Sequence, residues 1–411
     1  MTIPMSVPRR LVAACLGFTL LLALAAAEPA PSRVVAVGDV HGDYEEFAAI
    51  LQRVGLIDGN RRWTGGTATF VQTGDLLDRG ARSRECLDLV MDLQKQAPRD
   101  GGTVVPLLGN HEVMNVIGDL RYVTPEIFRS FAGPESERAR DRALKEYLAF
   151  LKAHEGHGHE VARPDKGAAR EKWMDEHPPG YFEHREAFGL DGQYGRWIRS
   201  NSAVVQVGDG LFVHGGLNPT VEFGSLRELN ERVAADLRDF DAMWKALVDG
   251  DLIWRHMGFA EAVRFASEEM ASRQAEGPIG EFPGRLAVIR LLGYKGWVTV
   301  SADGPLWYRG LGTEPEATLA GPLQAMLDRL GASYIVAGHS VVASKDVTTR
   351  FGSRVFLIDT GMLETVYFGR ASALDIVDGR FTAHQVDRMP RPLPPPPRRD
   401  GAPPGLPQTT R

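Results

Sequence analysis

The chain has 411 residues, of which 43% are hydrophobic, and it carries a formal net charge of −6. This length and apolar content are enough for one large domain or two ordinary ones, with a sizeable core. A protein that binds nucleic acid through its phosphates usually has a basic surface, so the negative charge argues against a nucleic-acid partner.

The N-terminus has the pattern of an export signal. Arg9 and Arg10 precede an apolar run, Leu11–Ala27, that ends in small residues. This pattern predicts that residues 1–27 are a secretory signal peptide, cleaved near Ala27. The alternative is a membrane anchor, although 17 residues are few for a span. We therefore expect an exported, periplasmic protein with no stable membrane association after cleavage.

Cleavage of this signal would leave one cysteine. Cys15 lies inside the predicted signal and Cys86 does not. The mature chain then has no intramolecular disulfide, so a large core or a bound metal is the expected source of stability. Cys86 falls on a predicted helix, where we expect it to act as a small buried hydrophobe.

Strands and helices alternate in the first part of the chain. Strands are predicted at 33–37, 67–72 and 103–108, and helices at 44–54 and 81–96. Strand–helix–strand repeats of this kind predict an α/β layered fold. Residues 118–197 are polar and mostly helical in pattern. We interpret them as an insertion that packs over the core.

The second half of the chain returns to strands. A hairpin is predicted at 203–213, helical pattern at 225–275, strands at 334–337 and 355–358, and a second hairpin at 371–386 that turns at Asp378-Gly379. These late strands suggest a second sheet packed against the first. We expect one domain at 33–388 and a disordered, proline-rich tail at 389–411.

Polar side chains follow five of the predicted strands at the point where each strand ends. They are Asp39 and His41; Asp75, Asp78 and Arg79; Asn110 and His111; His214; and His339. In open α/β sheets, ligands bind just outside the carboxyl ends of the strands. We therefore expect these side chains to meet at one site.

The residue types favour a metal site. Imidazole, carboxylate and amide oxygen together suit Mn, Fe or Zn. One arrangement uses Asp39, His41 and Asp75 for a first ion, and Asp75, Asn110, His214 and His339 for a second, with Asp75 bridging both. Any single Gly-Asp turn is usually only a strand terminator, so the prediction depends on all five strand ends agreeing.

Two ions about 3.5–4 Å apart suit phosphoryl hydrolysis. Ions held there would lower the pKa of a bound water to near neutral and so supply a hydroxide for in-line attack on phosphorus. His111 is the candidate general acid for the leaving oxygen, with Asp78 orienting its imidazole. Arg79 is the candidate phosphate clamp, because a guanidinium matches two phosphate oxygens at once.

Three of these segments resemble the successive motifs of calcineurin-like metallophosphoesterases of the phosphoprotein phosphatase branch. They are GDVHG from Gly38, GDLLDRG from Gly74 and GNHE from Gly109. The segments GRW from Gly195, FVHGG from Phe212 and DGPLWYRG from Asp303 are most similar to bacterial Shewanella-like protein phosphatases. The resemblance covers roughly 33–386 and is weak across 118–197.

The resemblance implies a four-layer fold, in which a two-sheet β-sandwich is flanked by helices, with a dinuclear metal centre at one edge. It also implies that Arg309 is a second phosphate-contacting arginine, and it suggests a preference for phosphotyrosine. Ser340 departs from the usual threonine but keeps a hydroxyl. The expected partner is therefore a phosphorylated protein or a small phosphomonoester.

Three functions stay open at this point. The leading hypothesis is a metal-dependent phosphomonoesterase that acts on Ser, Thr or Tyr phosphoproteins. The second is hydrolysis of diadenosine tetraphosphate or another nucleotide or small ester by the same chemistry. The third is a non-catalytic, metal-bound module that binds phosphoproteins, although such a module would not need His111 as an acid.

Overall fold

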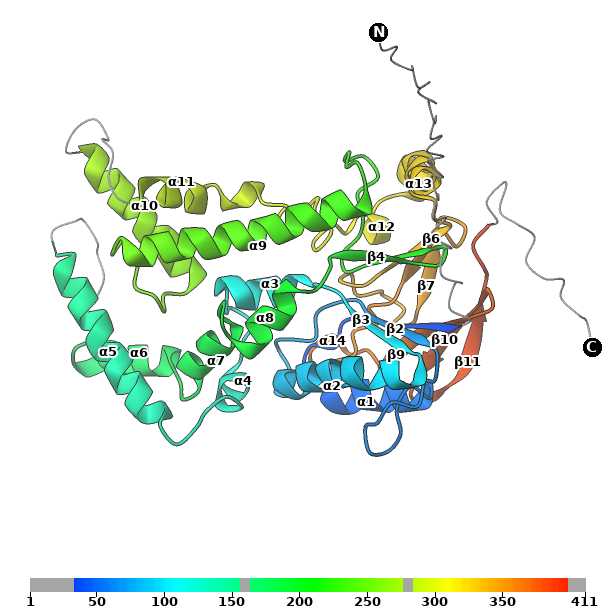
Figure 1. Cartoon of the computed structure of the whole chain (residues 1–411), viewed down its shortest axis with the longest axis horizontal. Coiled ribbons are helices and arrows are strands. Elements are labelled where there is room, and N and C mark those ends of the chain that lie inside the picture. Colours follow the sequence, from blue (N-terminus) through cyan, green and yellow to red (C-terminus); the bar gives the residue numbers. More distant parts are fainter. Residues whose placement is uncertain (1–32, 156–162, 276–283, 398–411) are drawn as a thin grey trace, which may run out of the picture. The chain divides into compact units, whose positions relative to one another are not determined.

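The computed structural model describes residues 33–155, 163–275 and 284–397. Its strands form two sheets (Figure 1). The first sheet has the order β11-β10-β9-β1-β2-β3, with β1 Arg33–Val37, β2 Thr69–Gln72, β3 Thr103–Pro106, β9 Ser372–Val377, β10 Arg380–Gln385 and β11 Arg388–Leu393. The second has the order β4-β5-β6-β8-β7, with β4 Val204–Val207, β5 Gly210–Val213, β6 Tyr334–Ala337, β7 Thr348–Arg350 and β8 Val355–Leu357.

The alternating direction of the apolar side chains along β1 explains how the layers stack. Val35 and Val37 belong to the apolar cluster that includes Phe47 and Ile50 of α1 (Tyr44–Arg53). Val34 and Ala36 belong to a different cluster, which contains residues of both sheets. Successive side chains of a strand point to opposite faces, so one face of the first sheet packs on helices and the other on the second sheet.

The second sheet is covered in the same way. Leu211, Ile335 and Ala337 pack in one cluster with Leu323 and Leu327 of α13 (Glu316–Leu330). Helices α1 and α2 (Ser83–Gln96) cover the other end of the stack. The predicted four-layer arrangement of two sheets between helices is confirmed.

The late hairpin belongs to a different sheet than we predicted. The late hairpin at 371–386 forms, with Asp378 and Gly379 at positive φ, but β9 pairs antiparallel with β1 and so joins the first sheet. The second sheet is instead built around the parallel strands β5, β6 and β8. Sequence pattern alone does not distinguish these pairings, because either sheet offers β9 an apolar face.

The predicted disordered tail is wrong for its first residues. Arg388–Leu393 pairs with β10 as the edge strand of the first sheet. Pro390 and Pro392 are tolerated there because an edge strand can leave one row of N–H positions unpaired. The Leu393 side chain is buried, and the Arg391 guanidinium donates to the Val347 carbonyl. Residues 398–411 of the predicted tail lie outside the described residues.

The remaining helices lie mostly in two stretches of the chain. The first holds α3 Asn110–Ile117, α4 Pro125–Arg129, α5 Ser136–Ala153, α6 Gly167–Glu176, α7 Tyr181–Phe188 and α8 Gln193–Arg199. The second holds α9 Leu226–Asp249, α10 Phe259–Ala275 and α11 Arg285–Leu292, and two single-turn helices follow, α12 Gly310–Thr313 and α14 Glu364–Tyr367. Within the described part of 118–197, all regular structure is helical.

These two helical stretches pack against one another. The Phe150 ring of α5 lies 5.2 Å from the Phe265 ring of α10, and Tyr147 lies 5.0 Å from Trp254. Their apolar residues join the same buried cluster as the helices that cover the first sheet. The helical region is therefore larger than the predicted insertion and shares its core with the α/β part.

Three further predictions concern Cys86, the signal peptide and membrane-spanning helices. Cys86 is a free cysteine and fully buried, as expected. The predicted signal peptide, residues 1–27, lies outside the described residues. Among the helices that the structure describes, none combines the length and the apolar character needed to cross a membrane.

Candidate metal centre

The carboxyl ends of six strands, three from each sheet, supply the site. Sheet pairing is parallel within β1-β2-β3 and within β5-β6-β8, so the carboxyl ends of each group lie at one edge. Together they line a cavity of about 370 Å³. Its walls include Asp39, His41, Asp75, Arg79, Asn110, His111, Arg309 and His339, while His214 lies fully buried next to His339. Asp78 is also buried behind the wall, against His111.

Asp75 is the centre of the cluster. Its Oδ2 lies 3.4 Å from His214 Nε2 and 3.8 Å from both His41 Nε2 and His111 Nε2. Two groups of possible ligand atoms result, His41–Asp75–His111 and Asp75–His214–His339, and each spans less than 4.8 Å. Asp75 belongs to both groups, as a bridging ligand must.

The first group differs in part from the predicted ligand set. Asp39 lies close by, with its Oδ2 3.9 Å from His41 Nε2, but it is not a member of the group. Its other oxygen accepts the backbone N–H of His339 at 2.9 Å. In the second group, Asn110 Oδ1 lies 2.9 Å from His214 Nε2, next to the grouped atoms. The ligand roles of Asp39 and Asn110 therefore stay predictions.

The hydrogen bonds of two imidazoles leave lone pairs directed at oxygen atoms. His41 Nδ1 lies 2.9 Å from the Leu77 carbonyl and His214 Nδ1 lies 2.9 Å from the Thr73 carbonyl. A carbonyl can only accept, so each Nδ1 carries the hydrogen and each Nε2 faces carboxylate or amide oxygens. Converging acceptors of this kind are stabilised by a proton, a guanidinium or a metal ion between them.

The pKa shifts agree with this need for positive charge. Burial lowers the pKa of His41 to about 3, so its ring is neutral and its Nε2 carries a lone pair. Burial also acts to lower the pKa of His214, but the Asp75 and Asp39 carboxylates outweigh it and raise the pKa to about 9. The buried Nε2 of His339 has no hydrogen-bond partner among the described residues. This donor set fits metal cations.

The backbone at these positions is strained. His41, Asp75, Asp78, Arg79 and His339 all have positive φ, between 50° and 71°. Such a conformation costs a non-glycine residue roughly 1–3 kcal/mol and persists only where the surroundings hold it. Here the His41 N–H donates to the Asp75 carbonyl and the Gly80 N–H to the His41 carbonyl, each at 2.9 Å. The loops after β1 and β2 therefore hold one another.

Glu112 supports the same loops, and our prediction from the sequence did not include it. Its fully buried carboxylate accepts three backbone N–H groups, from Asp75, Leu76 and Gly109, at 2.8–2.9 Å. The bond from the Gly109 N–H ties Glu112 to the N-cap of α3, which presents Asn110 and His111. A glutamate three residues after a strand-ending glycine is the signal that would have indicated this role.

His111 has the geometry of an acid held by a partner. Its Nδ1 lies 2.5 Å from Asp78 Oδ2, and Asn115 Nδ2 donates to the other Asp78 oxygen at 2.9 Å. Burial acts to lower the pKa of His111, but Asp75 and Asp78 raise it above its usual value. Its Nε2 remains directed at the cavity, on the side of Asp75.

Two arginines reach the cavity. Arg79 Nη1 donates to His41 Nε2 at 2.7 Å, and its guanidinium lies over the rings of Tyr122 and Tyr367, 4.6 Å and 5.4 Å from their centroids. Arg309 donates to the His339 carbonyl at 2.6 Å. An N–H donor and a metal ion compete for the His41 lone pair, so Arg79 must move if His41 is a ligand.

Three aromatic rings surround the cavity, and each lies against a different histidine. The centroid distances are 5.1 Å for Tyr122–His111, 5.5 Å for Tyr367–His41 and 5.7 Å for Trp307–His339. All three line the cavity wall, and we call them the aromatic collar. They come from three separate segments, two loops and the short helix α14, and no spacing in the sequence relates them.

Asp359 is a further buried carboxylate in the cavity wall. It follows β8 just as the predicted residues follow their strands. Burial raises its pKa to about 6, although its bond to the Gly361 N–H acts the other way. The strand-end pattern that identified the other five strands also applies to Val355–Asp359, so the sequence carried the signal and our prediction omitted it.

The chain matches a known protein family over most of its length. The family described as calcineurin-like phosphoesterase matches residues 32–343. The chain is 35% identical to Shewanella-like protein phosphatase 2 of Arabidopsis thaliana over 214 residues, which are 51% of this chain and 53% of that protein. It therefore spans about half the length of that relative.

Two further similarities cover very different shares of the chain. A cold-active protein-tyrosine phosphatase from a psychrophilic Shewanella species shares the fold, with a TM-score of 0.54, 23% identity, and coverage of 88% of this chain and 80% of that one. A symmetrical bis(5'-nucleosyl)-tetraphosphatase of Cronobacter sakazakii is 34% identical over 106 residues, which are 26% of this chain and 28% of that protein. The likeness to the tetraphosphatase is limited to a quarter of the chain.

Proposed function

Because the chain belongs to the calcineurin-like phosphoesterase family, we propose that it is a metal-dependent phosphatase that removes phosphate from proteins. One observation carries the proposal: two groups of possible ligand atoms share Asp75 and open into one cavity with two arginines. The family and these groups imply a dinuclear centre. We propose Mn, Fe or Zn as its metals, because imidazole and carboxylate ligands suit them.

The residues that would hold these ions are Asp39, His41, Asp75, Asn110, His214 and His339. Bound there, the ions would supply a lowered pKa for water and charge stabilisation of the phosphoryl oxygens. Arg79 and Arg309 bind and orient the phosphate from the cavity wall. His111 Nε2 gives a proton to the leaving oxygen, while Asp78 and Asn115 hold the ring in place.

We further propose a preference for phosphotyrosine over phosphoserine and phosphothreonine. The aromatic collar supports it, since the ring of phosphotyrosine can stack on Tyr122, Tyr367 or Trp307, whereas a serine side chain offers only a methylene group. An aromatic pair contributes about 0.5–1.5 kcal/mol beyond the area it buries. One lost ring then lowers kcat/KM for aryl esters about 2- to 12-fold.

The test is phosphate release by the purified protein with added Mn²⁺ on a phosphotyrosine peptide, a phosphothreonine peptide and diadenosine tetraphosphate. We expect the phosphotyrosine peptide to be hydrolysed fastest. Tyr122→Leu should lower that preference, and the matched Tyr122→Phe, which keeps the ring, should retain it. Faster hydrolysis of the dinucleotide would favour a nucleotide phosphohydrolase, and metal binding without any turnover would favour a phosphoprotein-binding module.

We also propose that the mature protein is exported to the periplasm. The pattern of Arg9, Arg10 and the apolar run Leu11–Ala27 supports this proposal. Expression of the full chain, cell fractionation and N-terminal sequencing would test it. A mature N-terminus near Glu28 in the soluble exported fraction is expected, and an intact N-terminus in the membrane fraction would indicate an anchor instead.

A further inference from the structure

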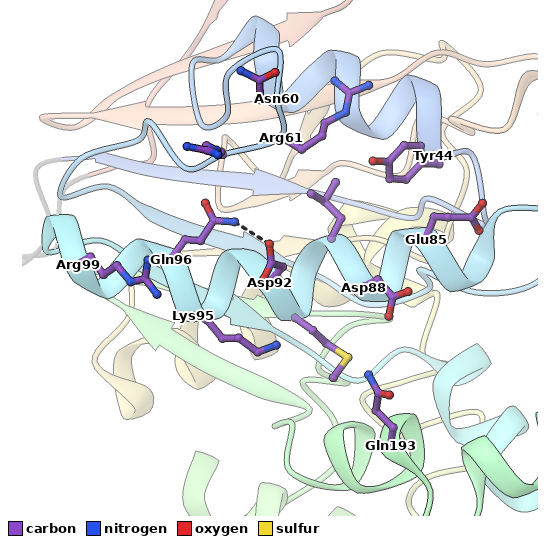
Figure 2. A pocket seen from close by; sticks show the side chains of 13 residues that line it. Tyr44, Asn60, Arg61, Glu85, Asp88, Asp92, Lys95, Gln96, Arg99 and Gln193 are labelled. Carbon is purple, nitrogen blue, oxygen red and sulfur yellow. Dashed lines mark hydrogen bonds between the residues drawn. The ribbon is translucent and has the colours of Figure 1, made fainter.

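The helical region contacts the α/β part of the chain along α2. Helix α8 lies beside α2 at a cavity of about 880 Å³, which Gln193 and Asp88 help to line (Figure 2). The Tyr194 hydroxyl donates to Asp88 at 2.7 Å, and Trp197 Nε1 donates to Gln94 of α2 at 2.6 Å. These five residues are not among those that line the metal cavity, so this contact joins the two parts without reaching the site.

A second contact lies at the carboxyl end of α3, the helix that begins at Asn110. The N–H of Phe259, at the start of α10, donates to the Gly118 carbonyl at 2.9 Å. The guanidinium of Arg185, from α7, packs on the same helix end, because a Cβ at residue 118 would lie only 2.7–2.9 Å from three of its atoms. Arg185 Nη1 lies 3.5 Å from the Asn115 carbonyl oxygen. Both helical stretches therefore hold this end of α3.

In the part of the chain that the structure describes, no carboxylate neutralises the charge of Arg185. Burial lowers the pKa of its guanidinium, and the ionisable groups that act on that pKa are Tyr181 and Arg199, neither of which is a carboxylate. An arginine nevertheless stays charged in a protein. Its buried Nε has no hydrogen-bond partner among the described residues. The last carbonyls of a helix carry partial negative charge, so the end of α3 is the favourable partner for this cation.

Contacts lead from Asn115 to the candidate acid. The Asn115 Nδ2 donates to Asp78 Oδ1 and to the His111 carbonyl, each at 2.9 Å. Asp78 Oδ2 in turn lies 2.5 Å from His111 Nδ1. Asn115 follows His111 by one helical turn, which is about 6 Å along the helix axis. A shift at the carboxyl end of α3 therefore moves both the His111 ring and the carboxylate that holds it.

We propose that Arg185 is a positioning residue for His111, and that the helical segment 118–197 acts on the reaction through it. The guanidinium fixes the carboxyl end of α3, and Asn115 and Asp78 transmit that position to the His111 ring. Arg185 itself does not line the metal cavity, so it acts without touching the substrate. The inference rests on the proposed phosphatase function, in which His111 gives a proton to the leaving oxygen.

Kinetics with two leaving groups test the proposal in the Mn²⁺-loaded protein. Arg185→Met removes the charge and the donors but keeps an unbranched side chain. It should lower kcat for phenyl phosphate about 10-fold, which is less than the roughly 100-fold that a 1 Å misplacement can cost. The loss for p-nitrophenyl phosphate should be smaller, because a good leaving group needs less help from an acid. KM should change little, and Arg185→Lys, which keeps the charge, should recover most of kcat.

A matched control and a double mutant separate positioning from a general loss of structure. Arg140 is a buried arginine of α5 that also donates to backbone carbonyls, those of Met174 and His177, so Arg140→Met should leave kcat for both esters unchanged. In an Asp78→Asn background, Arg185→Met should lower kcat for phenyl phosphate by less than about 2-fold, because the ring has already lost its holder. Equal losses for both esters, the full loss in both backgrounds, or the same loss in Arg140→Met would overturn the inference.

The proton between His111 and Asp78 gives a readout that does not depend on turnover. A proton in so short a charge-assisted bond resonates far downfield of the backbone amides, and its loss in Asp78→Asn identifies it. In the Zn²⁺-loaded protein, which is diamagnetic, Arg185→Met should shift this resonance or remove it through faster exchange with solvent, and Arg140→Met should leave it in place.

This resonance separates the inference from the proposed function. If the wild-type protein with Mn²⁺ hydrolyses neither ester while the resonance responds to Arg185→Met, the proposed function fails and the positioning role stands. If the wild-type protein hydrolyses both esters but the resonance is the same in Arg185→Met as in the wild type, the proposed function stands and the positioning role is overturned.

Discussion

The contact between Asp78 and His111 makes the most demanding prediction about the chemistry. In the structure, one Asp78 oxygen bonds His111 Nδ1 at 2.5 Å and the other accepts from Asn115 at 2.9 Å. In Asp78→Asn, a single oxygen must serve both donors, and the new amide group faces one of them. A buried donor then loses its partner, and the remaining bond no longer has a charged acceptor.

The magnitude follows from these two losses. An unpaired buried donor costs about 1–3 kcal/mol, and replacing a charged acceptor by a neutral one costs about 1 kcal/mol. If a total of about 2–4 kcal/mol falls on the transition state, kcat drops roughly 30- to 1,000-fold. Asp75 and the other candidate ligands are untouched, so we expect bound metal to stay near the wild-type amount.

The assay compares two aryl phosphates that differ in their leaving group. A general acid helps a poor leaving group more than a good one, so Asp78→Asn should reduce kcat more for phenyl phosphate than for p-nitrophenyl phosphate. Asp92→Asn is the matched control, since Asp92 is exposed on α2 and its carboxylate accepts from the Gln96 side-chain amide. An equal loss for both esters, or unchanged kcat with full metal content, would refute the role of His111 as acid.

Three further predictions concern stability and metal. Gly42→Ala places a Cβ 2.2 Å from the Gly80 carbonyl oxygen, at a residue with φ +72°. Gly55→Ala is the control, because Gly55 has a similar φ of +69° but open space around the new Cβ. Gly42→Ala should therefore lower Tm several degrees more than Gly55→Ala and should also reduce the amount of bound metal. Asp75→Asn should lose bound metal and turnover together, and its Tm should no longer fall when EDTA is added; turnover with full metal content would contradict the bridging role. Burial lowers the pKa of His184 to about 3, so the unfolded chain binds one more proton than the folded chain at low pH, and the free energy of unfolding falls as the pH drops below about 6.5. Between pH 7.5 and 5, the free energy of unfolding of His184→Phe should fall by about 2 kcal/mol less than that of the wild type. Chemical denaturation at each pH measures this difference, and an identical pH dependence of the two proteins would contradict the prediction.

The local geometry of the candidate site could be predicted because it is encoded in short stretches. Val34–Val37 ends at Gly38 and is followed at once by Asp39 and His41, and the same order recurs at Asp75 and Asn110. A buried strand, a turn and a polar side chain lie within a few residues, so the pattern does not depend on distant contacts. Parallel strands then bring these ends to one edge.

Other features could not be predicted from the sequence because distant segments create them. The final hairpin joins the first sheet through pairing of β9 with β1, more than 300 residues earlier in the chain. Arg388–Leu393 forms a strand despite its prolines because β10 offers a free edge. These outcomes depend on which partner strand is available, and a segment's own composition does not specify that.

The sequence by itself determined the type and order of the side chains at the strand ends, since a turn of a few residues needs no tertiary context. Only the tertiary structure decided which groups surround them. Tyr122, Trp307 and Tyr367 form the aromatic collar because two loops and the short helix α14 meet beside one cavity. Such surfaces arise from packing between segments remote in the chain, which no local pattern records.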